Sequence, residues 1–138
     1  ISRFSNYRHG LLEFLLANNT SIKVIVDEEP NEDSKSVNAT TNAFELLKTF
    51  SKTVRIGSKI QMRKVSNLNN VNALIQGELQ YKDVHFAVST ENMYRLELDS
   101  KLHFAECSFN GKETSNTLIN IFDKMFLDQD GLYTMPIN

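Results

Sequence analysis

The sequence has few of the residues on which many functional sites depend. Only 5 glycines, 2 prolines and 1 cysteine occur among 138 residues, and tryptophan is absent. The single cysteine, Cys107, excludes an internal disulfide and a zinc site built from several thiolates. The chain has no glycine-rich phosphate loop, no Gly-x-Ser-x-Gly elbow and no His-Glu-x-x-His pair. These absences weigh against the nucleotide-binding and zinc-protease classes.

Long apolar runs and an excess of positive charge are also missing. No stretch approaches the roughly 20 apolar residues that cross a bilayer, so we expect no membrane insertion. With 15 basic against 17 acidic residues, the net charge is -2, which argues against a general electrostatic attraction to nucleic acid. A hydrophobic fraction of 41% suffices for a core, and the lone cysteine suits a reducing compartment. We therefore expect a soluble, cytoplasmic globular protein.

The length of the chain fits one domain that spans residues 1–138. Its first residue is Ile1 rather than Met, and we expect the domain to be excised from a longer chain.

The first half of the sequence predicts alternating helices and strands. Apolar spacing predicts helices over 6–18 and 37–51, and β-branched residues over 21–27 predict a strand that is covered on both faces. Residues 27–33 combine proline with acidic residues, which is typical of an exposed loop. A second strand at 53–56 would complete a parallel βαβ unit.

The second half predicts antiparallel strands and a closing helix. A hairpin turn at 90–92 joins two of the strands. The closing helix begins at Asn110, with Glu113 in a capping-box position, and the tail after it shows no periodicity. The expected fold class is α/β, with a mixed sheet that is parallel in the first half, antiparallel in the second and flanked by helices. The expected strands of the second half are 60–65, 73–79, 84–89, 93–98 and 102–109.

Few side chains stand out as reactive groups. The three histidines are far apart in sequence and have no ligand-like spacing, so we expect neither a metal site nor a cofactor. Cys107 lies in an alternating strand, where a small buried hydrophobe is its simplest interpretation. The densest cationic cluster more often marks a charged strand edge than a phosphate site. This cluster is Arg55, Lys59, Arg63 and Lys64.

The order of elements resembles one repeat of the phospholipase D superfamily. The segment Val84-His85-Phe86-Ala87-Val88 is similar to the strand that carries the family's His-x-Lys-x-x-x-x-Asp motif. Met93-Tyr94-Arg95-Leu96-Glu97 resembles the strand that follows it, and 105–110 leads into the closing helix as in family members. The motif places His85 at the histidine position, Ala87 at the lysine position and Asn92 at the aspartate position.

The resemblance implies a degenerate site. In the family the histidine attacks phosphorus or protonates the leaving group, while the lysine neutralises phosphate oxygens, and alanine cannot do this. In the family two such motifs normally build one active site, and this chain is long enough for only one repeat. The resemblance therefore implies a catalytically inactive domain that binds a ligand, a protein or nucleic acid.

Two other functions remain open. One is a phosphodiesterase or nuclease that works as a homodimer through His85, with Arg95 or Lys82 as the substitute cation. The other is a structural or dimerisation domain of a larger protein. A phosphate-containing ligand or nucleic acid and a second copy of the chain are thus the expected partners.

Candidate ligand-binding positions follow from topology. Open α/β sheets bind ligands beyond the carboxyl ends of parallel strands, which indicates Asp27, Gly57 and the turn at Asn92. Together with the family motif, the candidates are His85 as a catalytic residue and Asp27, Lys82, Asn92 and Arg95 as ligand-binding residues.

Overall fold

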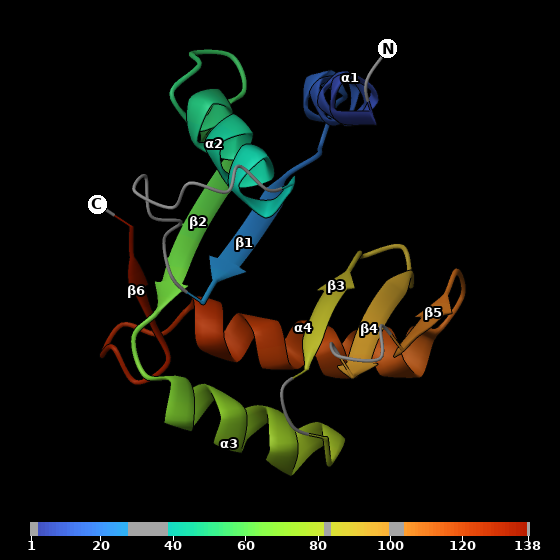
Figure 1. Cartoon of the computed structure of the whole chain (residues 1–138), viewed down its shortest axis with the longest axis vertical. Helices are drawn as coiled ribbons and strands as arrows, with labels where there is room; N and C mark the ends of the chain where they lie inside the picture. The colour runs from blue at the N-terminus through green and yellow to red at the C-terminus, as the bar shows by residue number, and fades with distance from the viewer. Residues whose placement is uncertain (1–2, 28–38, 82–83, 100–103, 138) are drawn as a thin grey trace. The chain divides into compact units, whose positions relative to one another are not determined.

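A computed structural model describes residues 3–27, 39–81, 84–99 and 104–137 of the chain. Most of the loop expected at 27–33 therefore lies outside the described residues. The chain divides into two compact units (Figure 1). Unit 1 comprises residues 1–64 and 136–138, and unit 2 comprises residues 65–135.

Unit 1 contains a parallel strand pair, as the sequence predicts. Strand β1 (Ile22–Val26) pairs with β2 (Ile60–Val65), with Ile22 opposite Ile60. The third strand of this sheet, in the order β1-β2-β6, is the short β6 (Thr134–Pro136), which begins in unit 2 and ends at Pro136 of unit 1. The helices are α1 (Arg3–Leu16), α2 (Ala39–Ser51) and the short 3-10 helix η1 (Gly57–Lys59).

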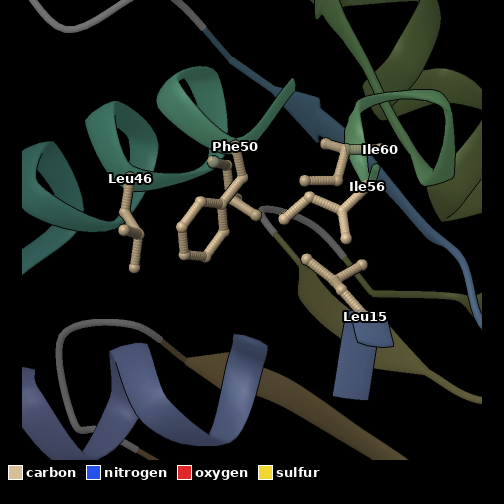
Figure 2. Close-up of a cluster of buried hydrophobic side chains, with 6 residues drawn as sticks. Leu15, Leu46, Phe50, Ile56 and Ile60 are labelled. Carbon is tan, nitrogen blue, oxygen red and sulfur yellow. The ribbon is translucent and has the colours of Figure 1, made fainter. Parts of the chain in front are cut away.

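The core of unit 1 forms where α1, α2 and the start of β2 meet. Figure 2 shows the side chains of Leu15, Phe50 and Ile56 pointing toward one another from separate elements. Leu15 is fully buried and Ile56 is 2% exposed. Burial of such side chains contributes about 1.5–3 kcal/mol each. The complete buried cluster is Leu15, Leu46, Leu47, Phe50, Ile56 and Ile60.

Two side chains satisfy the carbonyl groups at the end of α1. The ammonium group of Lys59 donates hydrogen bonds to the carbonyls of Leu15 at 2.7 Å and Ala17 at 2.8 Å. The hydroxyl of Thr20 donates to the carbonyls of Phe14 and Ala17. These bonds matter because the last carbonyls of a helix have no partner within it.

The strand predicted at 53–56 is wrong. Residues 52–56 form turns after α2, and the parallel partner of β1 is β2 instead. Gly57 makes the turn tight, because a Cβ there would collide with the backbone carbonyl oxygen of Ser51. The βαβ order is retained, but its second strand begins later than the β-branched run Thr53–Ile56 indicates.

Unit 2 contains an antiparallel sheet and two helices. The strands β3 (His85–Val88), β4 (Tyr94–Asp99) and β5 (Phe104–Ser108) form a sheet in the order β3-β4-β5. Both pairings are antiparallel, which confirms the expected hairpin. The described strands therefore form two three-stranded sheets, where one mixed sheet was expected.

Helix α3 (Leu68–Leu79) replaces a predicted strand. Residues 73–79 belong to this helix, whose buried side chains, Val71 and Ile75, lie one turn apart. The side chain of Asn67 accepts a hydrogen bond from the backbone amide of Asn70 and caps the helix. The helix ends at Gln80, which is left-handed with a φ of 63°. The Asn67 cap and the helical spacing of Val71 and Ile75 favour a helix here, although the composition of 73–79 is typical of a strand.

The closing helix α4 (Lys112–Phe126) is confirmed, but its predicted capping box is wrong. The residue before the helix is Gly111, and no side chain caps it. Gly111 fits because a Cβ there would meet the Tyr94 ring, and its amide donates to the carbonyl of Asn92. Thus the β3–β4 turn, rather than Glu113, fixes the start of α4.

A loop after α4 is ordered by a single carboxylate. Asp128 accepts hydrogen bonds from the backbone amides of Asp130, Tyr133 and Thr134. The buried hydroxyl of Thr134 donates to the carbonyl of Met125 at 2.6 Å. These bonds lead the chain into β6, a strand that the tail sequence did not predict.

Candidate functional site

The outer face of the β3-β4-β5 sheet carries two of the predicted site residues, His85 and Arg95. Side chains alternate between the two faces of a strand. Tyr94 and Leu96 are buried, which defines the inner face of the sheet. The register then puts a second set of side chains, with three polar or charged members and two alanines, on the opposite, outer face. This outer face consists of His85, Ala87, Arg95, Glu97, Ala105 and Cys107.

Arg95 is the central charge of the outer face. Its guanidinium donates to the carboxylate of Glu97 at 3.2 Å, and the two side chains are 55% and 21% exposed. Arg95 and Glu97 are two residues apart on β4, so their side chains lie on the same face of the strand. Because the pair is exposed to solvent, it contributes only about 0–1 kcal/mol to stability. The guanidinium is therefore held in place weakly and can be shared with a ligand.

Cross-strand register brings His85 close to Arg95. His85 lies directly opposite Glu97, and Ala87 lies directly opposite Arg95. His85 and Arg95 are thus diagonal neighbours, for which the separation is about 7–8 Å.

The imidazole of His85 faces solvent. His85 is exposed, and no residue in the described part of the chain hydrogen-bonds to it. Strand β3 exposes alternate side chains, His85 and Ala87, while Phe86 and Val88 turn inward.

The other predicted ligand residues do not join this face. Asn92 lies in the β3–β4 turn with a φ of 62°, and its backbone carbonyl accepts a hydrogen bond from the Gly111 amide. Asp27 is exposed at the end of β1, in unit 1. Lys82 lies outside the described residues. Gly57 precedes β2, so it lies at the amino end of that strand and not at the carboxyl end as expected.

Cys107 and the cationic cluster also differ from expectation. The thiol of Cys107 is exposed on the outer face, directly opposite Arg95, and is no buried hydrophobe. Lys59 is occupied by the carbonyls at the end of α1. The four cations of that cluster therefore do not act as one free group.

The inner face carries one polar contact that sequence alone did not indicate. The hydroxyl of Tyr94 donates to the carboxylate of Glu106 at 2.9 Å. This hydrogen bond and burial raise the pKa of Tyr94, while a hydrogen bond with Thr114 acts in the opposite direction. Strand alternation could have indicated this contact, because it puts the side chains of Tyr94 and Glu106 on the same face of the sheet.

The described residues offer neither a metal cluster nor a membrane-spanning helix. Across 3–27, 39–81, 84–99 and 104–137, no three His, Cys, Asp or Glu side chains are grouped to hold a metal ion. Within the same ranges, every helix is too short or too polar to cross a membrane.

Comparison with known proteins adds no relative. No protein family matches the chain, and neither a curated protein nor a solved structure is detectably similar to it. The functional argument therefore depends on the outer face itself.

Proposed function

We propose that this chain is a catalytically inactive phospholipase-D-like domain that binds a phosphate-containing ligand on the outer face of the β3-β4-β5 sheet. One observation supports the proposal most. His85 and Arg95 are diagonal neighbours on that exposed face, so their donors can reach oxygens of the same phosphate.

The same face lacks the groups for efficient phosphoryl chemistry. Ala87 occupies the lysine position of the motif, and Arg95 is already paired with Glu97. A phosphate must compete with that carboxylate for the guanidinium. The developing charge of a transition state would therefore receive little stabilisation, and weak binding without turnover is expected.

A single compound tests both parts of the proposal. Bis(p-nitrophenyl) phosphate is a phosphodiester whose binding is followed by backbone chemical-shift changes and whose hydrolysis is followed by nitrophenolate absorbance. We expect saturable shifts at β3 and β4 without hydrolysis above the rate in buffer. Absence of any shift in these strands would overturn the proposal.

Three variants place the binding on specific side chains. Arg95→Gln removes a charge-assisted hydrogen bond worth about 1.5–3 kcal/mol, so affinity should fall about tenfold or more. Glu97→Gln releases the guanidinium and should strengthen binding. Arg55→Gln, at an exposed arginine of unit 1, is the matched control and should leave the affinity unchanged. Equal affinities for all three variants would contradict a site at Arg95.

A second candidate function is a phosphodiesterase that acts as a homodimer through His85. It is favoured by one observation, the position of Arg95 directly across from Ala87, where its guanidinium can replace the missing lysine. In that case His85 attacks phosphorus and displaces one alcohol or phenol group of the diester, and water then hydrolyses the phosphohistidine and releases His85. Arg95 neutralises the phosphate oxygens in both steps. Hydrolysis of the same diester that disappears in His85→Ala would establish this function in place of the first.

A further inference from the structure

Strand β5 forms an edge of its sheet. In the order β3-β4-β5, it pairs with β4 on one side, and no other strand of the described chain pairs with it on the other (Figure 1). An edge strand presents a row of unpaired amide and carbonyl groups, which favours pairing with another strand. Proteins commonly prevent this pairing with lysine or proline on the edge strand.

β5 has little of that protection. Its sequence is Phe-Ala-Glu-Cys-Ser, so Glu106 is its only charged residue and it contains no proline. Large apolar side chains lie at both ends of the segment. Phe104, the first residue of the strand, is 61% exposed, and Phe109, just after its last residue, is 85% exposed. An edge of this composition suits a partner strand that is equally apolar.

The strand is compatible with a second copy of itself. Two antiparallel copies related by a two-fold axis place one residue opposite its own equivalent. An axis at Glu106 would give the longest overlap but oppose two carboxylates, which is destabilising. An axis one residue further, at Cys107, removes that repulsion because Glu106 then faces Ser108 of the second copy.

We infer that this chain forms a homodimer through antiparallel pairing of β5 with β5 of a second copy, with the two-fold axis at Cys107. The two sheets then join into one six-stranded sheet. Ala105 faces Phe109 of the second copy, so the exposed phenylalanine gains an apolar neighbour. This pair extends the ladder one residue beyond Ser108, the last residue of β5.

Disulfide trapping tests this register directly. In the proposed dimer the two Cys107 side chains are opposite each other, with Cβ atoms about 4.5–5.5 Å apart, close to disulfide distance. Brief treatment of the full chain with diamide, which accepts the two thiol hydrogens, should give a covalent dimer on a non-reducing gel. The matched control is the double variant Phe104→Cys, Cys107→Ser, in which the single thiol lies at residue 104 of the same strand. Residues 104 of the two copies are about 20 Å apart in this register, so the control should stay uncrosslinked.

Sedimentation tests the association without any thiol chemistry. We expect a dimer for the unmodified chain and for Cys107→Ser. Cys107→Lys opposes two like charges at the axis and should give a monomer with an unchanged far-UV circular dichroism spectrum.

Specific results would overturn the inference. A chain that is monomeric at all concentrations contradicts the dimer. A dimer that crosslinks equally well from residue 104 contradicts the register. The register is also wrong if oxidation of Cys107 does not crosslink the dimer and Glu106→Gln strengthens the association. That pair of results would put the two-fold axis at Glu106. None of these outcomes depends on phosphate binding by Arg95, so this inference and the proposed function fail separately.

Discussion

The phenol of Tyr94 on β4 donates a 2.9 Å hydrogen bond to the carboxylate of Glu106 on β5. The bond joins two neighbouring strands on the face of the sheet that also contacts Gly111 at the start of α4. Loss of the phenol proton would oppose two negative charges at this place. The contribution of this hydrogen bond to stability therefore depends on pH, and the direction of the change can be predicted.

Stability should fall at alkaline pH because of Tyr94. Its pKa is raised above the ordinary value of 10.0, chiefly by the Glu106 carboxylate. A group whose pKa is higher in the folded than in the unfolded chain stabilises the fold below the unfolded pKa. That contribution is lost as pH rises through the folded-state pKa. Urea unfolding from neutral pH to above pH 10 should show a steeper loss for the unmodified chain than for Glu106→Gln. Equal slopes would contradict the prediction.

Replacing Gly57 should destabilise unit 1. In Gly57→Ala the new methyl group collides with the carbonyl oxygen of Ser51, and backbone atoms must move to accommodate it. Overpacking of this kind costs about 1–3 kcal/mol. Gly77→Ala is the matched control, because residue 77 lies within α3 and nothing is within 4 Å of its added Cβ. The control should gain about 0.5–1 kcal/mol from helix propensity. If the urea midpoints of Gly57→Ala and Gly77→Ala moved in the same direction, the predicted collision with the Ser51 carbonyl would be contradicted.

Lys59→Met should weaken the attachment of α1. The variant keeps most of the aliphatic side chain but removes the donors to the Leu15 and Ala17 carbonyls. Leaving such acceptors without these bonds costs about 1–3 kcal/mol. Amide hydrogen exchange in the last turn of α1 should accelerate as well. Lys52→Met, at an exposed lysine just after α2, should change neither stability nor exchange.

Two fully buried hydroxyl groups should respond oppositely to removal. Thr134 donates to the carbonyl of Met125, so Thr134→Val leaves an acceptor without its donor and should cost about 1–3 kcal/mol. The hydroxyl of Ser115 has no hydrogen-bond partner among the described residues. Ser115→Ala should therefore be neutral or stabilising in thermal unfolding. A large loss of stability in Ser115→Ala would reveal a partner for that hydroxyl.

The antiparallel hairpin was predictable because the signals in β3 and β4 agree. β4 alternates apolar with charged residues, β3 alternates His85 and the small Ala87 with the larger apolar Phe86 and Val88, and a short polar turn lies between the strands. The helix α3 was not predicted, since its apolar residues also fit a short strand. Only the spacing of Val71 and Ile75 and the Asn67 cap identify it, and these signals are local and weak.

The candidate site was predictable in composition but not in arrangement. Alternation puts His85 and Ala87 on one face of β3, and Arg95 and Glu97 on one face of β4. Which residue faces which depends on the register, and a shift of one residue changes every pair. The bond from Lys59 to Leu15 is harder still, because the two residues are 44 positions apart and no local pattern links them.

The amide of Ser66 donates to the carbonyl of Tyr133 at 2.9 Å, near the two ends of unit 2. The polypeptide therefore enters and leaves this unit at neighbouring points. A unit with adjacent ends is suited to circular permutation, in which residues 66 and 133 are linked and new ends are opened elsewhere. It can equally be transplanted as a single insert into a surface loop of another protein, which would separate the β3-β4-β5 sheet from unit 1 without breaking any of its strands.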